Sequence, residues 1–164
     1  MSVIKSLQNY LDENHIDYVQ ITHSPAFTAK EVANTVHVDG KEVAKTVILD
    51  VDGNRVMTVL PASHKINIDF LESRMPDKEI KLTDEKVLME LFADCELGAM
   101  PPFGNLYQLP VFVASALSED EEIVFNAGTH TDAIKMRYED FVNLVHPVTI
   151  NFSESMEARE PYYK

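Results

Sequence analysis

One lysine stands where its charge could do chemistry. Lys45 lies in a β-rich run, KEVAKTVILDV (41 to 51), in which side chains alternate between the two faces of a strand. It shares its face with four apolar side chains, Val43, Val47, Leu49 and Val51. The pattern leaves two interpretations open. Lys45 is either a strand-end lysine that extends its ammonium into water, or an ammonium at the rim of an apolar pocket, ready to meet an anion or a developing negative charge.

A second feature is a loop rich in glycine and proline, GAMPPFGN (98 to 105). Its prolines do not suit a helix interior or a central strand, and its glycines let the backbone approach another group closely. Exposed backbone N–H groups near Gly98 to Met100 could therefore form an oxyanion hole or hold a carbonyl. An ordinary tight connection between a helix and a strand fits the same pattern.

The third feature is the segment FNAGTHTDAIKM (125 to 136), a strand that runs into Gly128 and then Thr129, His130 and Thr131. Binding groups often lie at such strand ends. His130 could act as a general base or donate to a substrate carbonyl. It could equally be a hydrogen-bonded structural histidine.

The other residue types that can do chemistry form no recognisable pattern. The six histidines show no HExxH and no closely spaced Cys/His set, so we expect no metal site. There is no GxSxG elbow, P-loop or GxGxxG, and we expect no cofactor. Cys95, the single cysteine, is expected to be a small buried thiol.

Hydrophobic spacing and turn residues predict the elements that position these groups. Helices are expected around Ile4, Leu7 and Leu11 with Ser2 as the cap, from the Thr28–Glu31 capping box to about Val36, and at 69 to 74, 84 to 92 and 138 to 145. Strands are expected at 17 to 21, on both sides of Asp52-Gly53-Asn54, and in LPVFVASAL, EEIVFNAG and VTINF. Residues 151 to 164 are expected to be a polar, frayed tail after a domain that spans residues 1 to 150. The predicted fold is mixed α/β: one domain with a mixed sheet covered by helices.

Composition limits the classes of function. No apolar run approaches the roughly 20 residues that cross a bilayer, and the first residues lack the pattern of a signal peptide. Together with the single cysteine, this leads us to expect a cytoplasmic protein without a membrane partner. The net charge is −13, from 14 Lys and Arg against 27 Asp and Glu. Such a chain cannot present a generally basic surface to nucleic acid.

Taken together, the segments resemble the YbaK family, also described as the prolyl-tRNA-synthetase-associated editing domain. The matching pieces occur in the family's order and cover nearly the whole chain to about Pro147. They are HSPAFTAKEVA (23 to 33), KEVAKTVIL (41 to 49), LPASHKI (60 to 66), CELGAMPPFGNLYQLPVFV (95 to 113) and FNAGTHTDAIKM (125 to 136). The resemblance implies a mixed, partly barrel-like sheet surrounded by helices.

The resemblance also implies which residues act. The family's lysine corresponds to Lys45, its G-x-x-x-P loop to Gly98 and Pro102, and its later glycine segment to Gly128, followed by His130. We therefore expect Lys45, Gly98 and His130 to be catalytic. The expected substrate-binding residues are Phe27, Thr46, Met100, Pro102, Phe103, Gly104, Gly128 and Thr129. Leu106 is a further candidate for the pocket wall.

By the same resemblance the protein is a free-standing aminoacyl-tRNA deacylase. A water molecule, assisted by a hydroxyl of the terminal ribose, would hydrolyse the ester of a mischarged tRNA without a metal or a protein nucleophile. Its partner is the tRNA acceptor end, and because of its acidic surface it could be helped by an aminoacyl-tRNA synthetase or an elongation factor. The alternative is an inactive binding module of the same fold that holds a small amino-acid-like or nucleotide ligand or a protein. Hydrolysis of another small ester or amide stays open as well.

Overall fold

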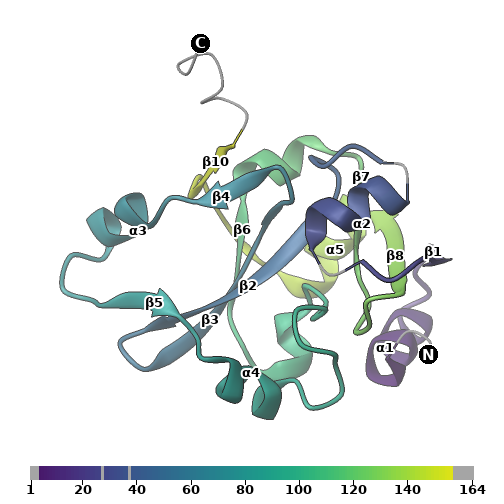
Figure 1. The fold of residues 1–164 in the computed structure, drawn as a ribbon, viewed down its shortest axis with the longest axis horizontal. Helices are drawn as coiled ribbons and strands as arrows, with labels where there is room; N and C mark the ends of the chain where they lie inside the picture. The colour runs from purple at the N-terminus through teal and green to yellow at the C-terminus, as the bar shows by residue number, and fades with distance from the viewer. Residues whose placement is uncertain (1–3, 27, 37, 157–164) are drawn as a thin grey trace.

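The computed structural model describes residues 4–26, 28–36 and 38–156. Two expected residues, the cap Ser2 and the pocket residue Phe27, lie outside this part of the chain. Figure 1 shows two sheets side by side, with the larger one toward α3 and the smaller one toward α1.

The hairpin at Asp52-Gly53 is the strand signal that the sequence marks most clearly, and it is confirmed. β2 (Ala44–Val51) and β3 (Asn54–Pro61) pair antiparallel, with Val51 opposite Asn54. Asp52 and Gly53 both have positive φ, at 52° and 84°, as a two-residue hairpin turn with the twist of the strands requires. Asp50 accepts a hydrogen bond from the Gly53 N–H at 2.7 Å and fixes the turn.

Five strands form the larger sheet in the order β5-β2-β3-β6-β9. β5 (Ile80–Leu82) pairs antiparallel with β2, while β6 (Val111–Ala114) and β9 (Val148–Ile150) add in parallel beyond β3. The sheet is therefore mixed, and the predicted mixed α/β fold is confirmed.

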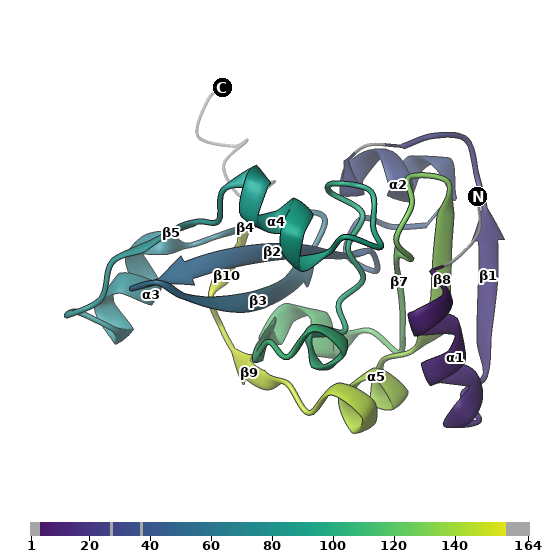
Figure 2. The same ribbon diagram turned by 90° about the horizontal axis from the view of Figure 1, so that it is seen from below.

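A three-stranded antiparallel sheet stands beside it in the order β1-β8-β7. Its strands are β1 (Tyr18–Thr22), β7 (Glu122–Asn126) and β8 (Asp132–Arg137). A parallel bridge between Val43 and Val124 joins this sheet to the start of β2. Seen from below in Figure 2, α1 (Lys5–Glu13) lies beside β8, and α5 (Tyr138–Val145) lies near β9.

The largest core cluster includes residues of both sheets together with α1 and α5. Phe103 is at its centre and is fully buried, with its ring 5.5 Å from the Phe125 ring and 5.7 Å from the Phe141 ring. A second cluster covers the other face of the larger sheet, where α3 (Ile68–Arg74) packs through Leu71. The larger sheet is thus buried on both faces, which explains the near-continuous apolar sequence of its strands.

The predicted helices are present. Thr28 caps α2 (Ala29–Thr35) by accepting from the Glu31 N–H at 3.1 Å, as the capping-box pattern predicts. α3 and α4 (Glu85–Leu91) lie within a residue or two of their predicted bounds, and α5 coincides with them. Two short 3₁₀ helices, η1 (Gly104–Tyr107) and η2 (Ser115–Glu119), flank β6.

Three expectations need correction. The run LPVFVASAL is a strand only to Ala114, since the chain turns there into η2. The sequence analysis also missed β8, the central strand of the smaller sheet.

The third correction concerns the C-terminal tail. Residues 151 to 156 belong to the domain, because β10 (Ser153–Ser155) pairs antiparallel with β4 (His64–Ile66) and Phe152 is fully buried. The rest of the expected tail lies outside the described residues.

Candidate functional site

His130 joins three separate segments of the chain. Its Nε2 lies 2.8 Å from the Leu97 carbonyl oxygen, and its Nδ1 lies 3.3 Å from the Ala26 carbonyl oxygen. Its backbone N–H donates to Glu96 Oε1 at 2.6 Å. Both ring nitrogens thus face backbone carbonyls, so the contacts suit a brace that positions the surrounding loops better than a general base.

Glu96 is a residue of this junction that the sequence analysis missed. Its carboxylate holds the His130 N–H, and its own N–H donates to the Gly128 carbonyl at 2.8 Å. The Gly128 N–H in turn donates to the Ala99 carbonyl at 2.9 Å. The glycine-proline loop and the later glycine segment therefore form one hydrogen-bonded unit. The signal in the sequence was an acidic residue just before Leu97-Gly98.

Gly98 is the exposed residue of the expected oxyanion group, and its amide has no hydrogen-bond partner within the described chain. Its φ is +87°, and the residue is exposed. Ala99 is buried, and its N–H already donates to the Glu96 carbonyl at 3.0 Å. Met100 is only 6% exposed. A Cβ built on Gly98 would lie 3.6 Å from Cε1 of His130, so the amide and the imidazole are neighbours.

The rest of this loop lies in the core, which corrects the expected pocket wall. Pro102, Phe103 and Gly104 are buried, like Met100. Any Cβ on Gly104 would press against Val111 and the Leu109 carbonyl. These four buried residues, Met100, Pro102, Phe103 and Gly104, therefore anchor the loop in the core and do not line an accessible surface. Leu106 is partly buried against the same core cluster.

The segment around Gly128 is equally tight. Gly128 has a φ of +98°, and a Cβ there would collide with the Ile4 side chain. Thr129 is 1% exposed and donates its hydroxyl to the buried Asp132 carboxylate at 2.6 Å. These contacts do not favour the expected role of Thr129 in substrate binding, because its hydroxyl is buried and already donates to Asp132.

β2 places Lys45 and Thr46 on opposite faces of the larger sheet. Thr46 shares its face with Ala44 and Ile48, which belong to the same core cluster as Met100 and Phe103. Its hydroxyl is buried and has no hydrogen-bond partner within the described chain. Thr46 is thus a polar β2 side chain on the loop's face of the sheet, between Ala44 and Ile48.

Lys45 lies opposite Leu60 of β3, and burial lowers the pKa of its ammonium below the usual value. Among the described residues it has neither an ion-pair partner nor a hydrogen bond to the 98–104 loop. Burial, and then the positive charge of Lys45, lower the pKa of His64, while Glu119 opposes them. Lys45 and Glu119 therefore both lie close enough to His64 to affect its charge.

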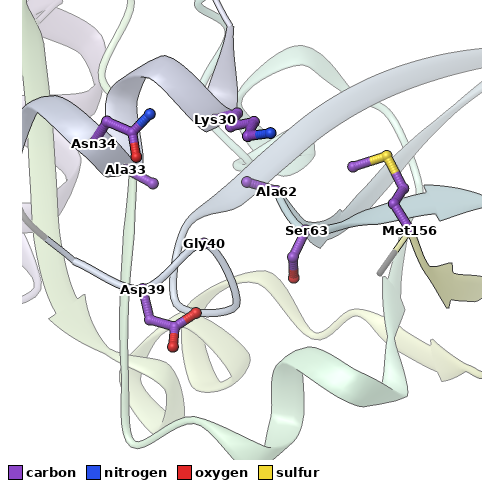
Figure 3. Close-up of a pocket in the computed structure, with 8 residues that line it drawn as sticks. All are labelled: Lys30, Ala33, Asn34, Asp39, Gly40, Ala62, Ser63 and Met156. Carbon is purple, nitrogen blue, oxygen red and sulfur yellow. The ribbon is translucent and has the colours of Figure 1, made fainter. Parts of the chain in front are cut away.

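A cavity of about 330 Å³ opens beside α2. Figure 3 shows Lys30 and Asn34 reaching it from α2, Ser63 from the turn between β3 and β4, and Met156 from the opposite side. Asp39, Gly40, Ala33 and Ala62 complete its lining. A lysine, an amide, a hydroxyl and the Asp39 carboxylate around one cavity suit a polar group that both accepts and donates hydrogen bonds.

Cys95, expected to be a buried thiol, is only partly buried against the largest core cluster. Burial raises the pKa of its thiol to about 12, and its Sγ lies 3.4 Å from the Tyr107 hydroxyl. A thiol with such a pKa is a poor nucleophile at neutral pH. Across residues 4–26, 28–36 and 38–156, no three His, Cys, Asp or Glu side chains gather in a way that could hold a metal ion. None of the helices in these ranges is long and apolar enough to cross a membrane.

Comparison with known proteins identifies relatives of this chain. A family model described as an aminoacyl-tRNA editing domain matches residues 23–144. A relative from Escherichia coli strain K12, the multifunctional Ser/Thr-tRNA deacylase ProXp-y, is 25% identical over 147 residues, which are 87% of each chain.

Solved structures agree on the fold. A candidate trans-editing enzyme for prolyl tRNA synthetase superposes with a TM-score of 0.79 at 17% identity, over 93% of this chain and 97% of that one. The hypothetical protein APE2540 gives a TM-score of 0.81 at 18% identity, over 92% of this chain and 100% of that one. At these identities the likeness establishes the fold alone.

Proposed function

The chain belongs to the aminoacyl-tRNA editing domain family, and from this premise we propose that it is a free-standing aminoacyl-tRNA deacylase. Water adds to the ester carbonyl, which becomes an oxyanion. The acyl–oxygen bond then breaks, the ribose oxygen takes up a proton, and the amino acid leaves as a carboxylate. A hydroxyl of the terminal ribose assists the water, and the reaction takes place in the cytoplasm with the acceptor end of the tRNA as substrate.

The observation that carries this proposal is the exposed Gly98 amide on a rigidly held loop. The loop is tied to the glycine segment through Glu96, Ala99 and His130. A donor held in place before the reaction stabilises developing charge without reorganising, and one such donor is typically worth a hundredfold to a thousandfold in rate, to order of magnitude. Gly98 would donate to the oxyanion, and His130 would position the loop.

The side chains of β2 take the other parts of the proposal. The Thr46 hydroxyl has no partner in the described chain, and we assign it a hydrogen bond to the bound aminoacyl group. The Lys45 ammonium would contact the phosphate or the ribose of the terminal nucleotide. Its partial burial, and the absence of a carboxylate partner among the described residues, support that role, because both strengthen its attraction for an incoming anion.

A deacylation panel tests the proposal. tRNAs charged with serine, threonine, alanine and proline are incubated with the wild-type protein and with Lys45→Ala, and the loss of ester is followed. Serine and threonine come first because the Escherichia coli relative is named for them. We expect at least one ester to decay faster with the wild type than without protein. Equal decay across the panel would reject a deacylase.

Thr46→Val separates a substrate contact from a structural role. Removing an unpartnered buried hydroxyl should leave the stability unchanged or slightly higher, while deacylation slows by about threefold to tenfold, the value of one neutral hydrogen bond. The matched control is Thr58→Val. The Thr58 hydroxyl donates to the Val47 carbonyl at 2.7 Å, so this variant should lose stability but keep its activity. Unchanged activity in Thr46→Val would remove Thr46 from the site.

The second candidate is a binding module that has lost hydrolysis, and the net charge of −13 favours it because such a chain attracts tRNA weakly. Thermal stabilisation by a non-hydrolysable aminoacyl-adenosine analogue, without turnover of any charged tRNA, would support this alternative.

A further inference from the structure

An apolar cavity lies on the face of the larger sheet that α3 covers. Its volume is about 360 Å³, near the lower end of the range for small-molecule sites, roughly 300–1,000 Å³. Four strands supply its floor: Leu49 and Val51 from β2, Val56 and Thr58 from β3, Phe112 from β6 and Ile150 from β9, with Phe152 following. Leu71 and Met75 close it on the α3 side.

The size of α3 explains why the cavity exists. Seven helical residues extend only about 10 Å, whereas strands spaced roughly 4.8 Å apart make the β2-β3-β6-β9 face wider than one helix can cover. Val56, Met75, Phe112 and Ile150 accordingly stay only partly buried. The Thr58 hydroxyl already donates to Val47, so it offers no free hydrogen to an occupant. The floor is therefore apolar.

The rim of the cavity carries positive charge, which is unusual in so acidic a chain. Arg74 and Lys78 both line it, together with Asn54. Lys78 lies 4.0 Å from the Asp52 carboxylate. Arg74 has no carboxylate partner within the described chain, and its guanidinium stands 5.7 Å from the centre of the Phe70 ring. An aromatic ring holds a guanidinium in place without neutralising it.

We propose that this cavity binds a small amphipathic carboxylate, with its apolar chain over the strand floor and its carboxylate on Arg74. The apolar floor selects the chain, and the unpaired guanidinium selects the anion by a two-pronged hydrogen bond. The net charge of −13 repels anions elsewhere on the surface, so an anionic ligand would be accepted where cations are locally exposed. The cavity is separate from Thr46 and the Gly98 loop, which lie on the opposite face of the sheet, and Lys45, which shares the cavity's face of β2, does not line it.

Isothermal titration with hexanoate, octanoate and decanoate, below their micelle-forming concentrations, tests the site. We expect one site per chain, with affinity rising about fourfold per methylene as each enters the cavity. Arg74→Gln should weaken decanoate binding about threefold to fivefold, the worth of one exposed charge pair, and leave decanol binding within about twofold. The matched control, Lys81→Gln, removes an exposed lysine that lines no part of this cavity and should change neither.

A second variant tests whether the ligand occupies the cavity itself. Val56→Phe fills the cavity and should abolish binding of both decanoate and decanol, while circular dichroism verifies the fold. The proposal is overturned if decanoate shows no saturable binding, if Val56→Phe binds it normally, or if Arg74→Gln weakens acid and alcohol equally. It is also overturned if sedimentation shows a dimer that Val56→Phe disrupts, because the groove is then the contact between two copies of the chain.

Discussion

At the scale of single residues, the polar groups of the candidate site divide by whether their hydrogen bonds are already made. The hydroxyl of Thr129 and the ring of His130 are committed to neighbouring groups of the protein. Neither the hydroxyl of Thr46 nor the amide of Gly98 has a partner in the described chain. We therefore propose that the uncommitted groups recognise the substrate and that the committed ones hold them in place.

Asp120 provides a test of local electrostatics away from this site. Burial first, and then the nearby carboxylates led by Glu42, raise the pKa of Asp120 from 3.8 to about 6, against the opposing charge of Lys41. The folded state thus binds the proton more tightly than the unfolded state. The contribution of Asp120 to stability is therefore lost as the pH rises from about 4 through about 6.

Asp120→Asn should accordingly raise the free energy of unfolding by roughly 1 kcal/mol at about pH 7.5, a value reduced because the group is partly solvated. The gain should vanish below about pH 4. Urea unfolding across this range measures it, with the exposed Asp77→Asn as control. A gain that is independent of pH would contradict the assignment.

At the scale of elements, the glycine segment and the last strand are held by packing as much as by hydrogen bonds. Because Gly128 has no side chain, the Ile4 side chain at the start of α1 can pack directly against it. The Ile4 N–H also donates to the Ala127 carbonyl at 3.1 Å. Phe152, the residue that enters β10, is fully buried in the core cluster that Leu71 of α3 joins. Both contacts join segments that are far apart in the sequence.

Gly128→Ala should cost about 2–4 kcal/mol of stability, because the new methyl group collides with Ile4 and the φ of +98° disfavours a side chain. Gly40→Ala is the matched control. A Cβ at position 40 meets Ser63 Cβ at 3.6 Å, which is an ordinary contact, so its effect should stay within about 0.5 kcal/mol. Chemical denaturation measures the free energy of unfolding of both variants. Equal midpoints would show that α1 does not pack on Gly128.

Phe152→Ala should destabilise the protein by about 3–5 kcal/mol, the usual cost of emptying a buried phenylalanine site. Met156→Ala, at a residue 43% exposed, should cost less than about 1 kcal/mol. Thermal unfolding compares the two. A mild effect of Phe152→Ala would restore the view that the domain ends near residue 150.

At the scale of the whole molecule, local signals in the sequence predicted the hairpin, the helices and the family. The hairpin turn at Asp52-Gly53 and the capping box from Thr28 to Glu31 each depend on a few adjacent residues, so both could be recognised from the local sequence. β8 was missed because its residues include only one β-branched side chain, Ile134, and because one of its two partners, β1, is far away in the sequence. Burial of Phe103 could not be predicted, since it depends on Phe125 of β7 and Phe141 of α5, which are distant in the sequence.

The net charge of −13 bears on how so acidic a molecule meets tRNA. Few lysines are placed to contact phosphates, so binding should release few counterions and depend weakly on salt. We therefore propose that recognition is confined to the acceptor end, by Lys45 and by the cavity beside α2 that Lys30 lines.

The most direct measurement is the single-turnover rate of ester hydrolysis on an acceptor-stem microhelix charged with serine or threonine. We predict that the wild-type protein hydrolyses the microhelix within about tenfold of the rate on full-length tRNA. Lys45→Ala should slow the reaction by about tenfold to a hundredfold, the value of a hydrogen bond to a charged group. The exposed lysine variant Lys81→Ala should match the wild type. No acceleration by the wild-type protein on either substrate, or equal rates for Lys45→Ala and Lys81→Ala, would contradict the account.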